Sequence, residues 1–445
     1  MGKGNSAVLD RIFKLSERNT NVKTEILAGF TTFIAMAYII FVNPNIISEA
    51  GIPKEAAIAA TIWATFISTC LMAFLANYPI AVAPGMGLNA FFTYTVVKSF
   101  GLHWTVALGA VFFSGVVFFI LTVTKVRNWI IDAVPASLRS AIPVGIGLFI
   151  AFIGMKNAGI VVKSDATLVA LGDLASPQVI LAVFGLILSA VLLSRGVKGS
   201  LIIGILATTV LGMIVGVSPA PKGIAGVVSL HLPSLAATFG KMNIREAWHF
   251  GIFNIIFAFT MVELFDNMGT LMGLLKKAGM LKEGGQHPGL GRAFISDSVG
   301  TMVSALCGTS TVTSYIESAA GIAEGGRTGL TALTVALLFI VSLFLAPLVG
   351  LVPGFATAPA LMLVGALMMS EIANIRFDDF TEVFPVFMTV IGMPLTYSIA
   401  TGLGLGFISY TLVKLCTGRG REVHWMMYII AICFAINYIL RAGGA

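Results

Sequence analysis

The chain consists mainly of apolar runs that are long enough to cross a lipid bilayer as helices. In chain order their approximate bounds are 25–43, 56–76, 79–97, 104–122, 134–155, 178–194, 199–217, 247–275, 292–307, 312–323, 329–347, 353–370, 380–396, 398–416 and 424–441. A helix that spans the hydrocarbon layer needs roughly 20 mostly apolar residues. Only 11% of the 445 residues are charged, whereas a soluble domain carries about 25%. The pattern predicts an all-α polytopic membrane protein with about 14 transmembrane segments, and it excludes an ordinary soluble enzyme or a disordered chain.

The basic residues indicate how such a chain is oriented. Its formal net charge is +7, which in a soluble protein would suggest a nucleic-acid partner. If the N-terminus is cytoplasmic and the first fourteen runs each cross once, most Lys and Arg residues fall in cytoplasmic loops, as the positive-inside rule requires. We therefore expect a multi-pass protein of the cytoplasmic (inner) membrane with its N-terminus inside. The basic residues are therefore expected to contact anionic membrane lipid and not nucleic acid.

The two ends of the chain differ from the apolar runs. Residues 1–24 are predicted to be a cytoplasmic segment and not a cleavable signal peptide, because Leu9–Ser16 is amphipathic and no small-residue cleavage site follows the first run. Residues 417–445 form a C-terminal hydrophobic tail. Within it, the run 424–441 is either a fifteenth crossing or a helix that lies against the bundle.

The two halves of the chain repeat each other weakly. Val134–Ser137 opens an apolar run that contains Gly147, and Val352–Phe355 opens another with Gly365 at the matching place. Seven crossings would separate the copies, so the halves would have opposite orientations in the membrane. Inverted repeats of this kind are typical of secondary transporters. The alternative is a chance similarity between apolar stretches.

Corresponding places in both halves carry a short, interrupted segment. In the third run, Ala83–Ala90 contains a proline and two glycines, which are poor helix formers. In the tenth, Thr309–Thr313 is rich in β-branched residues. Non-helical backbone at membrane depth is tolerated only where it is buried in protein or lines a cavity. Residues 83–87 and 309–313 are therefore expected to run extended, and the two stretches are expected to meet at a ligand site near the middle of the membrane.

Four acidic residues lie well inside apolar runs, namely Glu263, Asp266, Asp297 and Glu317. A carboxylate at this depth costs several kcal/mol if it is ionised and unpaired, so each is a candidate functional residue. The eighth and tenth runs contain no Lys or Arg that could pair with them. A desolvated carboxylate without a cationic partner favours its neutral form, which suits proton coupling. For any single residue the alternative is a neutral acid that donates a hydrogen bond to a backbone carbonyl.

Other chemistry has little support in the sequence. The five histidines lie in loops or at segment edges without metal-ligand spacing, and the four cysteines are scattered without a CxxC pair. Gly325–Gly329 lacks the pattern of a phosphate-binding loop. We therefore expect a protein that is not an enzyme and that needs neither a metal nor a cofactor.

Several motifs together resemble the adenine/guanine/hypoxanthine permease branch of the nucleobase/cation symporter-2 family. They are Gly29–Tyr38, Ala83–Phe92, Leu264–Leu271, Thr313–Gly321 and Gly325–Thr331. The resemblance implies the uracil-permease fold, with 14 crossings in two inverted seven-segment repeats and an elevator-type mechanism. It also implies a substrate-binding core domain from residues 25–122 and 247–347, and a gate domain from residues 123–217 and 348–416 that forms a homodimer.

The same resemblance assigns roles to individual residues. Asp266 matches the carboxylate that hydrogen-bonds the base, and Glu317 matches a glutamate that contacts the base or couples protons. Asn89 matches an asparagine that positions the site, and Asp297 an acidic residue of the ninth segment. Thr270 stands where uracil permeases have a histidine. Further expected site residues are Gly87 and Thr313, with Phe33, Phe91, Phe265 and Tyr315 available for stacking.

The leading hypothesis is a proton-coupled symporter that imports purine nucleobases, with adenine favoured over guanine or hypoxanthine. The first alternative is a channel with a ring of carboxylates, against which the inverted halves argue. The second is an anion exchanger on the same fold, which the lack of a basic residue in the eighth and tenth runs disfavours. A membrane-embedded enzyme acting on lipid lacks a nucleophile–base pair.

Overall fold

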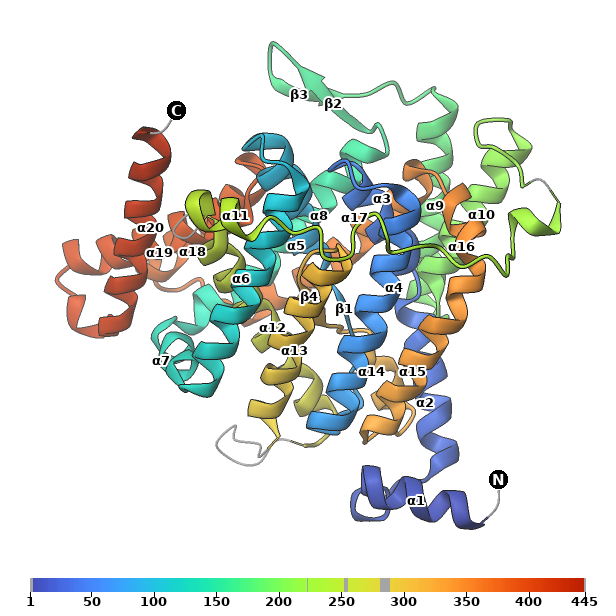
Figure 1. The fold of residues 1–445 in the computed structure, drawn as a ribbon. Helices are drawn as coiled ribbons and strands as arrows, with labels where there is room; N and C mark the ends of the chain where they lie inside the picture. Colours follow the sequence, from blue (N-terminus) through green and yellow to red (C-terminus); the bar gives the residue numbers. More distant parts are fainter. Residues whose placement is uncertain (1–2, 222, 252–254, 281–288, 444–445) are drawn as a thin grey trace.

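The computed structural model describes residues 3–221, 223–251, 255–280 and 289–443. The chain forms a helical bundle with two short pieces of β-structure (Figure 1). The first half contains α1 (Lys3–Phe13), α2 (Val22–Met36), α3 (Ile39–Ser48), α4 (Lys54–Leu71), η2 (Met72–Ala76), β1 (Val82–Pro84), α5 (Met86–Ala90), η3 (Phe91–Ser99), α6 (Trp104–Val123), α7 (Val126–Ala133), α8 (Ala136–Asn157), β2 (Val161–Ser164), β3 (Leu168–Leu171), α9 (Pro177–Ser194) and α10 (Ser200–Ile214). The second half contains α11 (Ile244–Gly251), α12 (Phe257–Lys277), α13 (Leu290–Cys307), β4 (Val312–Ser314), α14 (Ser318–Ala323), α15 (Gly329–Val341), α16 (Ala346–Leu351), α17 (Gly354–Met368), η7 (Met369–Asn374), α18 (Phe380–Leu395), α19 (Ile399–Cys416), η8 (Gly420–Glu422) and α20 (Trp425–Gly443).

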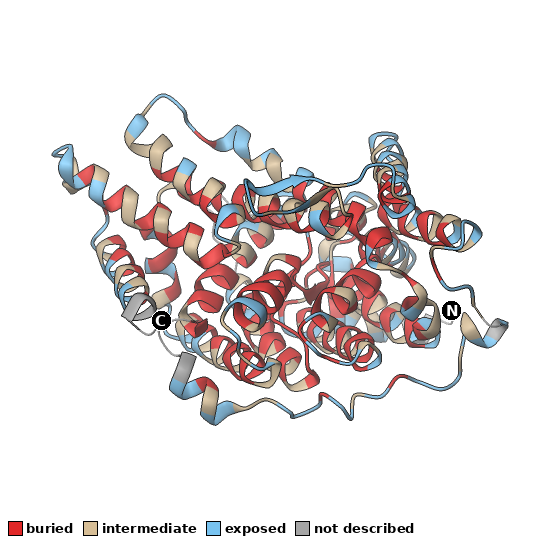
Figure 2. Ribbon diagram, turned by 90° about the horizontal axis from the view of Figure 1, so that it is seen from above, coloured by how far each residue is buried: buried red, intermediate tan, exposed pale blue. Residues whose placement is uncertain are grey.

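Within the described residues, eight helical spans are long and apolar enough to cross a membrane. This number is smaller than the 14 crossings expected from the sequence. The difference has a physical cause, because the other expected crossings are short helices such as α10 and α18, acid-bearing helices such as α12 and α13, or the two interrupted segments. Seen from above, the buried faces of the helices point towards the centre of the bundle (Figure 2).

The two interrupted segments pair with each other in the centre of the bundle. Strands β1 and β4 are antiparallel, and Ala83 lies opposite Thr313. The N–H of Gly85 donates to the carbonyl of Thr311 at 3.1 Å, and the N–H of Tyr315 donates to the carbonyl of Ala81 at 2.9 Å. Both strands are buried, so this pairing satisfies backbone groups that water cannot reach. Both stretches thus contain extended backbone, as expected, but the first is shorter than residues 83–87 because helix α5 already begins at Met86.

Helices α8 and α17 cross where each has a glycine. A Cβ added to Gly147 would lie 2.7 Å from the carbonyl oxygen of Gly365, and one added to Gly365 would lie 2.3 Å from the carbonyl oxygen of Gly147. Each glycine therefore allows the backbone of the other helix to approach closely. These are the two glycines that occupy matching places in the two halves of the sequence.

A second antiparallel pair, β2 with β3, follows α8 directly and forms a hairpin beyond one end of the bundle (Figure 1). The all-α fold expected from the sequence did not include these strands, so the fold is mainly and not entirely helical. At the C-terminus, α20 packs against α19 and α7.

Glu25, at the start of α2, is a further buried acid, in addition to Glu263 and Asp297, and it was not expected from the sequence. Its carboxylate accepts hydrogen bonds from the backbone N–H of Arg327 at 2.8 Å and from the hydroxyls of Thr328 at 2.8 Å and Thr331 at 2.6 Å. It thereby satisfies free N–H groups at the N-terminus of α15, where negative charge is favourable. Glu25 lies at the very edge of the first apolar run, so the sequence did not identify it as an acid inside the membrane.

Candidate substrate-binding cavity

A cavity of about 450 Å³ lies beside the paired strands. One wall is formed by α8, α17 and η7, and the other by α12, β4 and the start of α14. Met86 and Gly87 of α5 contribute from the first interrupted segment, and Tyr38 contributes from the junction of α2 and α3. The cavity thus lies where the sequence predicts that the two interrupted segments meet.

Asp266 faces this cavity from α12. Its side chain is partly exposed, and it has no hydrogen-bond or ion-pair partner within the part of the chain that the structure describes. Its neighbours Phe265 and Asn267 along α12 are buried, whereas Asp266 itself faces the open space. Leaving a carboxylate unpartnered at this depth is costly, and a ligand that donates N–H groups would remove that cost.

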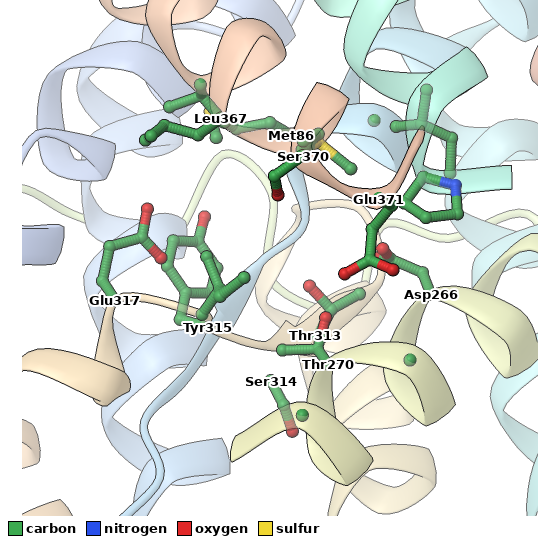
Figure 3. A pocket seen from close by; sticks show the side chains of 18 of the residues that line it. Met86, Asp266, Thr270, Thr313, Ser314, Tyr315, Glu317, Leu367, Ser370 and Glu371 are labelled. Atoms are coloured by element: carbon green, nitrogen blue, oxygen red, sulfur yellow. The ribbon is translucent and has the colours of Figure 1, made fainter. Parts of the chain in front are cut away.

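Glu317 lies on the other side of the cavity from Asp266, with Tyr315 and Thr313 between them (Figure 3). It is partly exposed and comes directly before α14. Unlike Asp266, it has a partner, because the hydroxyl of Tyr38 donates to its Oε1 at 2.5 Å. The two cavity carboxylates therefore have different environments.

The ring of Tyr315 is held in place through its hydroxyl. Its hydroxyl donates to the carbonyl of Pro84 at 2.6 Å, which ties the start of the tenth segment to β1. Phe265 also lines the cavity and packs edge-on against Phe407 at a centroid distance of 5.8 Å. An aromatic ring held rigidly in a cavity wall is a suitable surface for a flat ligand.

Six of the residues expected at the site line the cavity, namely Gly87, Phe265, Asp266, Thr313, Tyr315 and Glu317. The structure places the other expected residues elsewhere.

Asn89 is fully buried, and its Oδ1 accepts a hydrogen bond from the hydroxyl of Ser310, so it joins the two interrupted segments. Phe91 packs edge-on against Phe259 at 4.9 Å, and Phe33 packs edge-on against Phe339 at 5.3 Å. None of these three side chains lines the cavity.

Glu263 and Asp297 lie one layer behind the cavity. Glu263 accepts a hydrogen bond from the hydroxyl of Thr301, and Asp297 accepts one from Ser314 at 3.3 Å. Both acids are fully buried, and neither has a basic partner among the described residues. Ser314 belongs to β4, so Asp297 is one hydrogen bond away from a strand that lines the cavity.

The cavity extends along α12 to Lys277, and two further charged residues line its facing wall, Arg139 of α8 and Glu371 of η7. In Figure 3 the carboxylate of Glu371 is drawn next to that of Asp266. The lack of basic residues in the eighth and tenth runs was expected to disfavour an anionic ligand. Two basic residues nevertheless line the cavity, because α12 continues to Lys277 and because α8 contributes Arg139. Tyr38 was also missed as a cavity residue, although it ends one of the recognised motifs.

A bundle of apolar helices around a central cavity that contains acidic side chains is typical of a membrane permease. A model described as "Permease family" matches residues 23–405, and the chain belongs to this family of permeases, the nucleobase/cation symporter-2 family expected from the sequence motifs. As in its relatives, this is a transport protein and not an enzyme.

The relatives cover the chain almost completely. It is 51% identical to a putative permease of Methanocaldococcus jannaschii over 98% of this chain and 99% of the relative. It is 44% identical to the guanine/hypoxanthine permease PbuO of Bacillus subtilis over 96% of this chain and 100% of the relative. It is 43% identical to the adenine permease AdeP of Escherichia coli over 97% and 96%.

Among solved structures, the chain is similar to the transmembrane domain of the cyanobacterial bicarbonate transporter BicA, with a TM-score of 0.62 and 14% sequence identity. The match covers 85% of this chain and 97% of that domain. At this identity the likeness shows the fold alone.

Proposed function

We propose that the protein is a proton-coupled symporter that imports purine nucleobases, with adenine as the preferred substrate. The observation that carries the proposal is the pair of cavity carboxylates. Asp266 is partly exposed and unpartnered, whereas Glu317 faces it and is held by Tyr38. Asp266 is therefore available to accept hydrogen bonds from a ligand. Glu317 is hydrogen-bonded to the Tyr38 hydroxyl, which can reorient when Glu317 gains or loses a proton.

A purine base suits this cavity chemically. The base is flat and neutral, and its edge carries both donors and acceptors. Asp266 accepts hydrogen bonds from the N–H groups of the base, while Phe265 and Tyr315 offer aromatic surface and Thr313 a hydroxyl. Discrimination between bases follows because an analogue that lacks the matching donor leaves a buried polar group unpaired.

The relatives support a purine substrate but do not separate adenine from guanine or hypoxanthine, since relatives named for either are about equally similar. The preference for adenine rests on Leu264–Leu271, which looks closer to adenine-type members. Proton coupling rests on the membrane-embedded acids Glu317, Asp266, Asp297 and Glu263, for which no cofactor is needed.

We further propose 14 crossings in two inverted repeats that move as an elevator. The cavity lies between helices assigned to the gate, α8 and α17, and elements assigned to the core, α12, β4 and α14. The antiparallel β1–β4 pair and the reciprocal contact of Gly147 with Gly365 are what two-fold related halves would produce. We place the protein in the inner membrane with its N-terminus inside, surrounded by anionic lipid, as a homodimer formed through the gate.

Anion exchange is the second candidate, and Arg139 with Lys277 in the cavity wall favours it. Both basic residues lie at the end of the cavity, whereas Asp266 and Glu317 lie beside the paired strands. An anion that reached the strands would meet two carboxylates and no cation, which favours a neutral substrate at that depth.

Uptake into proteoliposomes tests the proposal. The purified protein is reconstituted, and uptake of labelled adenine is measured with an inward proton gradient, with an inward sodium gradient, and with neither. Unlabelled adenine, guanine, hypoxanthine, xanthine and uracil then compete. We expect saturable, proton-driven accumulation that adenine inhibits most strongly and uracil least. Full accumulation with sodium alone would overturn proton coupling, and exchange of bicarbonate without purine uptake would favour the anion exchanger.

A further inference from the structure

We propose that the same cavity binds purine nucleoside 5′-monophosphates as inhibitors, with the base beside Asp266 and the phosphate between Arg139 and Lys277. The inference rests on the proposed function, because it places the base of the nucleotide in the nucleobase site. It adds a second ligand class and a form of regulation.

The cavity follows one face of α12 from the base site to its end. Asp266, Thr270, Gly273 and Lys277 are spaced 4, 3 and 4 residues apart and all line it, as expected for one stripe of a helix. Asp266 and Lys277 are eleven residues apart, which corresponds to about 16 Å along the axis. Helical side chains lean towards the N-terminus, so the Lys277 ammonium group reaches back towards Asp266. The remaining gap is comparable with the length of a nucleoside monophosphate.

The middle of this path is open. Gly269 and Gly273 both line the cavity, and a Cβ added to either would have no heavy atom within 4 Å. Most glycines in the bundle instead make close contacts with neighbouring helices, as Gly147 and Gly365 do. These two glycines therefore leave space beside α12 that a single base would not fill and that a ribose could occupy.

The two basic residues face the path from opposite walls. Arg139 belongs to α8 and Lys277 to α12, and neither side chain has a hydrogen-bond or ion-pair partner within the described part of the chain. Glu371 of η7, which also lines the cavity, accepts a hydrogen bond from Asn374 at 2.8 Å and forms no ion pair with either basic residue. Both basic side chains are exposed and therefore solvated in this structure. A neutral base would not use these two cations, whereas a phosphate that replaced the water would bind the guanidinium and ammonium groups strongly.

The position of the phosphate explains why the nucleotide would inhibit and not be transported. A phosphate that bridges Arg139 and Lys277 holds the α8 wall and the α12 wall together, and so opposes the movement of one against the other. It also cannot move past Asp266 and Glu317 without approaching two carboxylates. Because such nucleotides form when a purine base is joined to a ribose phosphate, the product of that reaction would limit further import.

Equilibrium binding in detergent, where both ends of the protein are accessible, tests this inference. Labelled adenine is bound to the purified full-length protein and displaced with AMP, adenosine, ribose 5-phosphate or inorganic phosphate. We expect AMP to displace adenine at least ten-fold more strongly than adenosine does. Ribose 5-phosphate and inorganic phosphate alone should not displace it.

Charge-neutral variants locate the phosphate. In Arg139→Gln and in Lys277→Gln, the affinity for AMP should fall at least ten-fold relative to the adenine affinity of the same variant. Lys276→Gln is the matched control, because Lys276 is the adjacent residue of α12 and does not line the cavity. Its ratio of AMP to adenine affinity should equal that of the wild type.

The outcomes separate this inference from the proposed function. If adenine binds but AMP does not displace it, the nucleotide site is overturned and the purine permease stands. If inorganic phosphate displaces adenine as well as AMP does, the site is a simple anion site and the inference is again wrong. If Lys276→Gln loses AMP affinity as much as Lys277→Gln, the phosphate is not held where we place it. If neither adenine nor another purine binds, both proposals fail.

Discussion

At the scale of single residues, the two carboxylates of the cavity differ in what surrounds them. Asp266 has no partner in the described part of the chain, while Glu317 accepts a hydrogen bond from Tyr38. An unpartnered carboxylate gains most from a ligand that donates to it. A carboxylate with a resident donor is less dependent on the ligand, so it can change protonation while the base stays bound.

Asp266→Asn should therefore weaken adenine binding, and Glu317→Gln should weaken accumulation more than binding. Losing one charge-assisted hydrogen bond costs about 1.5–3 kcal/mol, which corresponds to roughly ten- to a hundred-fold in affinity. Equilibrium binding, counterflow and proton-driven uptake are measured on the same reconstituted variants. Glu317→Gln should retain counterflow while it loses concentrative uptake.

Asp165→Asn serves as the control for both variants, because Asp165 lies on the exposed β2–β3 hairpin with a side chain that is 92% exposed. Wild-type adenine affinity in Asp266→Asn would contradict the role of Asp266. Accumulation against a gradient in Glu317→Gln would contradict the role of Glu317.

The sequence could predict the acids of the site because a carboxylate in an apolar run is conspicuous whatever its orientation. It could not predict which way Asn89 and Phe91 point. That depends on the helical phase after an interrupted segment, where the chain enters α5 and then the π-helix η3. Lys277 was missed for a different reason, since α12 continues two residues beyond the predicted end of the apolar run.

At the scale of elements, the crossing of α8 and α17 depends on two glycines. Gly365→Ala should destabilise the protein, because the new Cβ would lie 2.3 Å from the carbonyl oxygen of Gly147, which is backbone and cannot move away easily. Overpacking of this kind costs about 1–3 kcal/mol. The midpoint of thermal unfolding in detergent measures the effect.

Gly354→Ala on the same helix is the matched control, because a Cβ there has no heavy atom within 4 Å. Alanine forms helix better than glycine, so Gly354→Ala should be neutral or slightly stabilising. An equal midpoint for Gly365→Ala and the wild type would show that the two helices can separate without cost.

The loop ends of α18 and α19 are held by an acid–base cluster. Hydrogen bonds from Arg419 and then Lys414 lower the pKa of Glu422 from 4.5 to about 2. Hydrogen bonds from Thr381 and then Arg419 lower the pKa of Asp379 below its usual value. Lys414 is buried and lies 2.8 Å from Glu422. Two carboxylates therefore prefer their charged form in the folded protein.

This cluster predicts a loss of stability in acid. Because the folded-state pKa of Glu422 is lowered, its contribution is complete above pH 4.5 and is lost as the pH falls towards 2. Glu422→Gln should lower the unfolding midpoint at pH 7 and reduce its decline between pH 7 and pH 3. Glu17→Gln, which removes an exposed pair with Lys14, should change neither quantity. An unchanged decline in Glu422→Gln would exclude Glu422 as its source.

The elements themselves were partly predictable. Proline, glycine and β-branched residues indicated extended stretches in the third and tenth segments, and each of these segments contains a short strand, β1 or β4. The pairing of β2 with β3 was not predicted, because this hairpin is short and neither strand is buried, so no core face imposes an alternating pattern on it. Its register depends on a turn and not on a core face.

At the scale of the whole molecule, α8 runs from the end of the bundle where the cavity is open to the opposite end, where the helices are held together. It begins near Arg139, where the cavity opens, and it ends at Asn157. There Tyr94 of η3 donates to Glu49 at 2.8 Å, and Asn157 donates to the Tyr94 hydroxyl at 3.3 Å. Lys156 lies 4.8 Å from the centre of the Tyr94 ring. These contacts tie α3 and η3 to α8 at the end opposite the cavity opening.

If the protein works by alternating access, this contact must open when the cavity faces the other side. Tyr94→Phe removes a hydrogen bond to a carboxylate, worth about 1.5–3 kcal/mol, but keeps the ring against Lys156. Tyr94→Ala also removes the cation–π contact, worth about 0.5–2 kcal/mol. Hydrogen–deuterium exchange at Phe91–Ser99 should therefore increase from wild type to Tyr94→Phe to Tyr94→Ala.

Tyr428→Phe is the control for this series, because it removes a tyrosine hydroxyl that donates to the carbonyl of Gly420 at 2.9 Å, far along the chain in α20. It should leave exchange at Phe91–Ser99 unchanged. Weaker closure at one end should also reduce the time that the cavity spends open at the other. AMP, which we place at the Arg139 end, should therefore bind Tyr94→Ala less tightly than wild type. Wild-type exchange in Tyr94→Ala would show that the closed end is held by other contacts.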